Sequence, residues 1–178
     1  IFGLVRWRSP LDNIRGSLDN INLIQGELRD LSSMIKVIDE VRPDRIFHLG
    51  AQSFVPTSYH SPGDTFAVNI NGSVNLLDAV RNIGIDPMIH MCSSAEVYGQ
   101  VDETMIPITE NTPFNPASPY AVSKVGQDLL GRQYYITYGM KIIRTRMFTH
   151  SGPRRGDFFA ESAFAKQIAE IELGVIPN

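Results

Sequence analysis

The chain has 178 residues, enough for one domain with its own hydrophobic core. Hydrophobic residues make up 43% and charged residues 20% of it, as in ordinary globular proteins, and the net charge is −3. This composition gives no sign of nucleic-acid binding or of a basic membrane-binding face, and no apolar run reaches the length of a bilayer span. The single cysteine, Cys92, excludes an internal disulfide and a multi-cysteine zinc site, and it suits the cytoplasm, where we expect the protein.

Short apolar runs alternate with longer helical patterns along the chain. The expected strands are IFGLVR (1–6), INLIQG (21–26), RIFHLG (45–50), MIHMCSS (88–94) and KIIRTRMF (141–148). The expected helices are Ser32–Val41, Thr65–Asn82, Pro119–Tyr138 and Phe159–Leu173. This alternation predicts an α/β fold with a doubly wound parallel sheet, whose strands are covered on both faces.

Several residues are expected to mark the ends of these helices. Ser32 is a candidate N-cap of the first helix, and Pro43 follows the end of that helix. Gly84 and Gly139 come just after the two long helices, where glycine commonly forms a C-terminal cap.

Ligands of such sheets bind at the carboxyl ends of the strands. In this chain those ends are VRWRS, GELRD, HLGAQS, CSSAEVYG and FTHSGPRRG. Four of the five contain glycine, alanine or serine where the backbone has room to approach a ligand. The alternative is that these segments are polar and rich in small residues only because loops are exposed.

The segment SPYAVSK places Tyr120 four residues before Lys124, which puts both side chains on one face of a helix. A lysine held there stabilises a tyrosinate and brings the phenol toward use as a base near neutral pH. A surface pair without a catalytic role is the alternative, because this spacing often occurs by chance.

Together, CSSAEVYG and SPYAVSK resemble the extended short-chain dehydrogenase/reductase family that acts on nucleotide sugars. HLGAQSFVPTSY and SGPRRGDFF are most similar to the GDP-mannose 4,6-dehydratases, and the resemblance runs from Ile1 to about Leu173. It implies a Rossmann-like fold, an NADP-dependent hydro-lyase and a nucleotide-sugar substrate. The two long helices match those that form a four-helix interface in this superfamily, which implies a homodimer or homotetramer.

Family members open with a strand and a Gly-rich turn, G-x-x-G-x-x-G, and they continue with a C-terminal region that shapes the sugar pocket. Neither segment is found in this sequence. We therefore expect residues 1–178 to be a partial dinucleotide-binding domain, incomplete at both ends. The first strand of the family lies between the strands that match IFGLVR and RIFHLG, so we expect a gap or an unnatural pairing there.

The resemblance implies four catalytic residues. Tyr120 takes the proton of the sugar 4-hydroxyl, and Lys124 lowers the pKa of Tyr120 and hydrogen-bonds the nicotinamide ribose. Ser94 hydrogen-bonds the reacting oxygen, and Glu96 removes the proton at C5. Ser94 and Glu96 have structural alternatives, as a cap of a strand end and as a solvated loop carboxylate.

Glu96 separates the possible activities, because a reductase or an epimerase needs no such acid. A GDP-4-keto-6-deoxyhexose reductase and a nucleotide-sugar 4-epimerase of the same family remain open. So does an alternative of another class, a non-catalytic dinucleotide-binding fragment.

Cofactor choice depends on Arg6 and Arg8, which lie at the end of the first strand. NAD enzymes usually have an acid there, whereas two guanidinium groups suit the 2′-phosphate of NADP. The alternative is that both are solvated loop charges. By resemblance, the other cofactor-binding residues are Glu27, Leu28, Leu49, Gly50, Ala51, Gln52, Ser53, Tyr120, Lys124, His150 and Arg155.

Three of the matched positions depart from the usual residue of the dehydratases. Glu27 replaces an aspartate, Ser94 a threonine and Thr149 an asparagine, and the last change leaves room for a different substrate. His48 is expected to be a packed strand residue. His60 and His90 lack metal-ligand spacing, so no metal site is expected.

Overall fold

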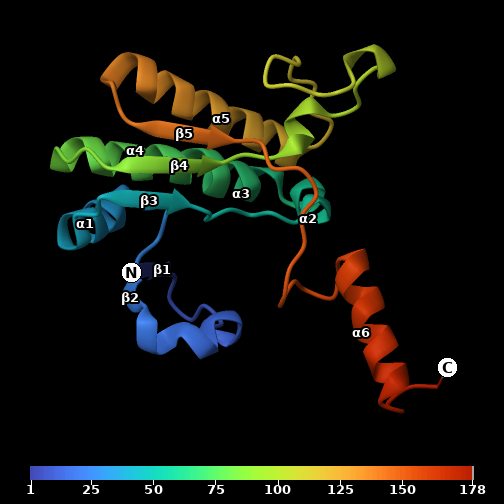
Figure 1. Cartoon of the computed structure of the whole chain (residues 1–178). Helices are drawn as coiled ribbons and strands as arrows, with labels where there is room; N and C mark the ends of the chain where they lie inside the picture. The colour runs from blue at the N-terminus through green and yellow to red at the C-terminus, as the bar shows by residue number, and fades with distance from the viewer. Residues whose placement is uncertain (178) are drawn as a thin grey trace. The chain divides into compact units, whose positions relative to one another are not determined.

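The computed structural model describes residues 1–177, in which strands and helices alternate (Figure 1). The strands are β1 (Phe2–Val5), β2 (Asn22–Gln25), β3 (Arg45–His48), β4 (Met88–Cys92) and β5 (Ile142–Thr145). The α-helices are α1 (Leu31–Val41), α2 (Val55–His60), α3 (Pro62–Phe66), α4 (Gly72–Ile83), α5 (Pro119–Tyr138) and α6 (Ala160–Glu172). The short helical segments are η1 (Asp12–Asn20), the π-helical η2 (Ala67–Asn71), η3 (Ala95–Tyr98) and η4 (Glu103–Met105). The chain forms two compact units, residues 1–148 and a unit that begins at Thr149.

The described strands pair in parallel as two separate sheets. β1 pairs with β2, and β4 lies between β3 and β5. The predicted α/β class with parallel strands is confirmed. None of the described strands joins the two sheets by pairing, and the missing strand between them stays a prediction.

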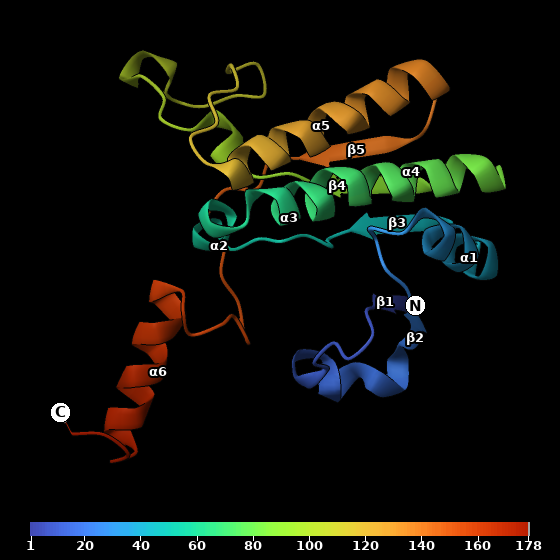
Figure 2. The same cartoon turned by 180° about the vertical axis from the view of Figure 1, so that it is seen from behind.

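Helices α1, α4 and α5 lie on one face of the three-stranded sheet, as seen from both sides in Figures 1 and 2. Alternate strand residues, such as Ile89 and Met91 of β4, are fully buried toward this helical layer. The core there also includes Leu77 and Val80 of α4. On the opposite face Phe47 is 69% exposed, so within residues 1–148 helices cover one face of this sheet, whereas the sequence predicted strands covered on both faces.

The helix ends agree with the prediction at their glycines. Gly84 and Gly139 adopt left-handed conformations with φ of 73° and 68°, and the amide of Gly139 donates to the carbonyl of Tyr135 at 3.0 Å. The predicted cap Ser32 is wrong: α1 begins at Leu31, and the carboxylate of Asp30 accepts from the amide of Ser33 at 2.9 Å.

The second predicted helix, Thr65–Asn82, is longer and less regular than expected. It consists of α3, η2 and α4 in succession, from Pro62 to Ile83. Helix α2 and segment η1 were not predicted, because neither has a clear apolar period.

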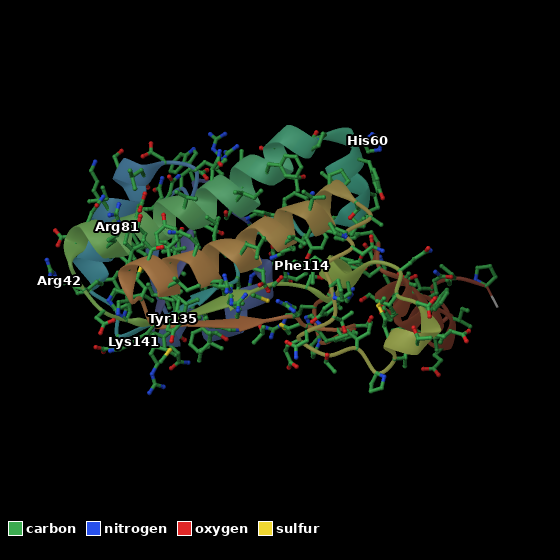
Figure 3. All side chains as sticks on the ribbon, turned by 90° about the horizontal axis from the view of Figure 1, so that it is seen from above. Arg42, His60, Arg81, Phe114, Tyr135 and Lys141 are labelled. Atoms are coloured by element: carbon green, nitrogen blue, oxygen red, sulfur yellow. The ribbon has the colours of Figure 1, made fainter. Side chains whose placement is uncertain are left out.

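The labelled side chains in Figure 3 locate the two ends of the sheet. Arg42, Arg81, Tyr135 and Lys141 lie at the end where the strands begin, and Phe114 lies toward the end where the strands finish. The candidate site is at this second end. Within residues 1–177, every helix falls short of the length or the apolarity that a membrane span requires.

Candidate active site

Helix α5 brings Tyr120 and Lys124 together at its first turns. Ser118 caps this helix by accepting from the amide of Ala121 at 3.0 Å, and Pro119 occupies the first helical position. Tyr120 is 9% exposed and Lys124 4% exposed. The ammonium of Lys124 lies 5.9 Å from the centroid of the Tyr120 ring, so the predicted pair exists and faces the interior rather than bulk water.

Burial dominates the protonation of Tyr120. It raises the pKa of the phenol above its ordinary value, and a hydrogen bond with Ser94 opposes this by favouring the phenolate. The direction is the opposite of the one expected from the Tyr–Lys pair. The physical reason is that the phenol is desolvated while the ammonium of Lys124 is hydrogen-bonded elsewhere.

The ammonium of Lys124 is held by two oxygen acceptors. It donates to the carbonyl of Cys92 and to Oε1 of Gln127, both at 2.8 Å. Burial lowers the pKa of Lys124 to about 8, because the charged form is desolvated. Lys124 is therefore charged at neutral pH, and its position is fixed by β4 on one side and by its own helix on the other.

Ser94 and Glu96 follow the end of β4. Ser94 caps η3, because its hydroxyl accepts from the amide of Glu96 at 3.2 Å, and it also hydrogen-bonds Tyr120. Glu96 is exposed, and its charge raises the pKa of Tyr120, which puts the carboxylate within electrostatic range of the phenol. The structure therefore brings the four predicted catalytic residues to one place.

A pocket of about 670 Å³ lies at the carboxyl ends of β1 and β2. The predicted cofactor residues Arg6, Arg8 and Glu27 line it, together with the buried Gly26. A Cβ atom on Gly26 would lie 2.7 Å from Cδ1 of Leu4, so a larger residue would crowd the floor of the pocket. Both arginines are exposed, so their guanidinium groups are available to an anion.

Glu27 is less available to a ligand than the sequence suggested. Its carboxylate accepts two hydrogen bonds from the guanidinium of Arg29, both at 3.2 Å, and this pairing lowers the pKa of Glu27. Arg29 also reaches Asp64 at 3.1 Å. The acid is therefore largely neutralised, which leaves Arg6 and Arg8 to set the charge of the pocket.

The predicted loop Leu49–Ser53 packs beside the end of β2. A Cβ atom on Gly50 would lie 2.6 Å from Cδ1 of Leu28, so these two predicted cofactor residues are in contact. Leu49 is 66% exposed, whereas Ala51 and Gln52 are half-buried and Ser53 is exposed. The amide of Gln52 donates to Oδ1 of Asn69 at 2.8 Å, which ties the loop to η2.

The remaining predicted cofactor residues, His150 and Arg155, belong to the second unit. Arg155 donates to the carbonyl of His150 at 2.9 Å, and its guanidinium lies 3.8 Å from the ring centroid of Phe159. Their contact with a cofactor stays a prediction.

His48 and His90 have structural partners. His90 bonds Oγ1 of Thr145 at 2.7 Å and packs edge-on against Phe47. His48 is buried and bonds the hydroxyl of Ser73. In the described part of the chain, His, Cys, Asp and Glu side chains form no group of three that could hold a metal ion.

A family model described as GDP-mannose 4,6 dehydratase matches residues 6–177. The chain belongs to this family. The match includes the Tyr120–Lys124 pair, the loop Leu49–Ser53 and Arg8, so the residues assembled above lie within the family's own sequence pattern.

Curated relatives have two related activities. The chain is 39% identical over 173 residues to the GDP-mannose 4,6-dehydratase of Yersinia enterocolitica, covering 94% of this chain and 46% of that protein. It is 38% identical over 136 residues to the GDP-6-deoxy-D-mannose reductase of Pseudomonas aeruginosa, covering 76% of this chain and 45% of that protein. The chain therefore spans a little under half the length of the curated relatives that it matches.

Solved structures of related enzymes share the fold. RMD from Pseudomonas aeruginosa, complexed with NADPH, superposes with a TM-score of 0.82 at 32% identity, over 93% of this chain and 58% of that one. DesIV, a dTDP-glucose 4,6-dehydratase from Streptomyces venezuelae, was solved with NAD bound and superposes with a TM-score of 0.80 at 26% identity, over 94% of this chain and 52% of that one. The predicted Rossmann-like fold is confirmed.

Sequence reasoning missed a set of buried polar residues behind the pair. Asn69 donates to the hydroxyl of Ser123 at 2.8 Å, and Ser73 and Gln127 lie between His48 and Lys124. A signal was present in the sequence: Thr65, Asn69 and Ser73 recur every four residues on the helical face that also presents Leu77 and Val80. Polar residues on a core-facing stripe indicate a buried hydrogen-bond network.

Sequence reasoning also missed Asp128, which anchors helix α5. Its fully buried carboxylate pairs with Arg144 of β5 and, at 2.9 Å, with Arg146. Arg146 continues to the hydroxyl of Tyr98 at 2.9 Å, and it lies 4.5 Å from the ring centroid of Phe114. This network fixes η3, and with it Glu96, against helix α5.

Proposed function

We propose that the protein is an NADP-dependent 4,6-dehydratase that converts GDP-mannose to GDP-4-keto-6-deoxymannose. The single observation that supports this most is the grouping of Ser94, Glu96, Tyr120 and Lys124 at the end of β4 and the start of α5. Membership of the family and the relative at 39% identity support the same activity.

In this mechanism the chain supplies the proton transfers and the positions of the reacting groups. Tyr120 takes the proton of the 4-hydroxyl as C4 becomes a ketone, and Ser94 hydrogen-bonds the same oxygen. The proton at C5 becomes acidic beside that ketone, and Glu96 removes it. The acid form of Glu96 then protonates the departing hydroxyl at C6, and water is lost. A nicotinamide bound beside Tyr120 and Lys124 would supply the acceptor for the C4 hydride and the donor of that hydride to C6, and the proton taken by Tyr120 would return to the sugar at C5, so the cycle would be redox-neutral.

The charges of the pocket fit NADP. Arg6 and Arg8 are exposed at its edge, residues 6–10 after β1 include no acid, and the nearby Glu27 is paired with Arg29. Guanidinium groups bind phosphate oxygens with charge-assisted bonds, so the arginines would hold the 2′-phosphate of the adenosine ribose. The NADPH complex of RMD supports this choice, while the NAD complex of DesIV represents the other one.

The outer face of α5 supports a dimeric assembly. Leu129, Tyr135 and Ile136 are 46%, 61% and 59% exposed, and apolar groups of this size are usually covered by a partner. We propose a homodimer or homotetramer that packs through α4 and α5, in the cytoplasm. Sedimentation of the protein with Ile136→Asp should show a smaller particle than the unmodified protein.

The test of the proposed activity uses the complete gene product with NADP and GDP-mannose. A 4-keto-6-deoxy sugar nucleotide, detected by mass spectrometry, is the expected product. If no such product forms, and an added 4-keto-6-deoxy sugar nucleotide is instead reduced by NADPH, the protein is a reductase like the Pseudomonas relative.

A further inference from the structure

A chain of buried hydrogen bonds begins at Lys124 and ends at His48. The ammonium donates to Oε1 of Gln127 at 2.8 Å, and Nε2 of Gln127 donates to the hydroxyl of Ser73 at 3.0 Å. The same hydroxyl lies 2.9 Å from Nε2 of His48. Gln127 and Ser73 are fully buried, and His48 is 4% exposed. This series of hydrogen bonds links α5, α4 and β3 through side chains alone.

Counting hydrogen-bond donors and acceptors assigns every proton in this series of hydrogen bonds. Ser73 donates its only hydroxyl hydrogen to the carbonyl of Asn69 at 2.6 Å, so its oxygen can only accept from Gln127 and from His48. His48 must therefore carry a hydrogen on Nε2. Burial lowers the pKa of His48 to about 4, and the nearby charge of Lys124 acts in the same direction, so His48 is the neutral Nε2–H tautomer.

The same count fixes the amide of Gln127. If it were flipped, its NH₂ group would face the ammonium of Lys124, and its oxygen would face a hydroxyl that has no hydrogen left to donate. The oxygen is thus kept toward Lys124 by Ser73. An ammonium has three hydrogens, and two are used by Gln127 and the carbonyl of Cys92. Within residues 1–177 the third has no hydrogen-bond acceptor and is available to a ligand.

We infer that Gln127 is a positioning residue for the proposed reaction: it holds the Lys124 ammonium in its charged form and aims the third N–H at the cofactor ribose. This inference rests on the proposed function for the identity of the ligand, but the state of Lys124 itself does not depend on any substrate. Gln127 acts through Lys124 and does not touch the reacting atoms.

Other groups near Lys124 act on its charge from each packed element. Cys92 of β4 raises the pKa of Lys124, His48 of β3 is neutral, and burial raises the pKa of Tyr120 on the same helix. Asp128, one turn farther along α5, is paired with Arg144 and Arg146. Gln127 is therefore the side-chain acceptor whose removal changes the solvation of this ammonium most directly.

The experiment measures the pKa of Lys124 in the ligand-free complete gene product, with lysine labelled by ¹³C at Cε and followed by NMR as pH rises. Loss of a signal in Lys124→Arg assigns the resonance. Gln127→Leu removes the acceptor at similar volume, and its expected effect is a pKa lower by about one to two units. Gln127→Glu keeps an oxygen and adds a negative charge, and it should move the pKa in the opposite direction. Gln133→Leu, an exposed glutamine on the same helix, is the control and should change nothing.

Opposite shifts in Gln127→Leu and Gln127→Glu support the inference, and equal values in all variants overturn it. If Gln127→Leu does not fold, Gln127→Met, which also removes the amide oxygen at similar volume, takes its place, because a merely structural glutamine would leave the pKa of Lys124 unchanged when the oxygen is lost. Activity gives a separate answer. Shifts without turnover of GDP-mannose keep this inference and reject the proposed function, whereas turnover with unshifted values does the reverse.

Discussion

Lys124 and Arg8 are both cations assigned to the same cofactor, but they lie in very different surroundings. Lys124 is 4% exposed and donates to two fixed oxygens, whereas Arg8 is exposed and its guanidinium lies 5.7 Å from the ring centroid of the exposed Trp7. The position of the Lys124 ammonium is set by packing before any ligand binds. Arg8 lines an open pocket, and its final position depends on the anion that it meets.

The two residues illustrate two roles of a positive charge in a protein. A buried cation with fixed acceptors has a shifted pKa and little freedom, which suits a group that must act on protons and hydroxyls. An exposed guanidinium keeps its charge at any ordinary pH and adapts to a phosphate, which suits recognition. Substitutions in the buried region should therefore affect catalysis and stability, and those in the open pocket should affect cofactor choice.

Removing the phenol should have the largest effect. Tyr120→Phe deletes the proton acceptor while keeping the ring in place, so we expect kcat to fall by about 10³-fold, in the range of lost general acid–base catalysis. Binding of NADPH, followed by its fluorescence, should change little. A variant that kept most of its activity would remove Tyr120 from the mechanism.

Breaking the ion pair that anchors α5 should have the next largest effect. Asp128→Ala leaves Arg144 and Arg146 without their carboxylate, and we expect the free energy of unfolding to fall by about 3 kcal/mol. Urea unfolding measures it. Asp12→Ala, which breaks an exposed ion pair with Arg15 in η1, is the control. It should leave the free energy of unfolding nearly unchanged. Equal losses in the two variants would show that burial is not the cause.

Acid should destabilise the buried region through His48. Its pKa falls from 6.5 to about 4 on folding, so the unfolded chain binds a proton that the folded chain does not between these values. The stabilisation is complete above pH 6.5 and is lost as pH falls toward 4, with an expected size of about 3 kcal/mol. His48→Gln should flatten the pH dependence of unfolding in that window. An unchanged slope would mean that other groups cause the acid loss.

The smallest expected effect is in the open pocket. Arg8→Ala should weaken NADPH binding by about tenfold and leave NADH binding unchanged, because only NADPH carries the 2′-phosphate. Fluorescence titration with both cofactors measures the ratio. The control is Arg15→Ala, because Arg15 is also an exposed arginine and lies close to Arg8 in the sequence. A loss of affinity for both cofactors alike would contradict the assignment.

Sequence patterns predicted the fold because apolar periodicity and glycine caps are local features. The runs that contain β3, β4 and β5, and the caps Gly84 and Gly139, could be found without coordinates. The cap of α1 was missed because Asp30 and Ser32 are both good capping residues, and the choice between them depends on where β2 delivers the chain.

The candidate site was predictable where spacing or resemblance fixed it. Tyr120 and Lys124 are one helical turn apart, and the turn after β4 keeps Ser94 near them. The shift in the pKa of Tyr120 was not predictable, because it depends on how deeply the phenol is buried. Gln127 was missed for a similar reason: its partner Ser73 is 54 residues away in the chain and is brought close only by the packing of α4 on α5.

The most direct test of the account compares Glu96→Gln with Glu103→Gln in the complete gene product, supplied with GDP-mannose and NADP. Both acids are exposed and follow β4, but only Glu96 acts on Tyr120. The account predicts that Glu96→Gln still oxidises C4, seen as a burst of reduced-nicotinamide absorbance, yet forms almost no 4-keto-6-deoxy product, while Glu103→Gln matches the unmodified enzyme. Product formation by Glu96→Gln at the unmodified rate would contradict it.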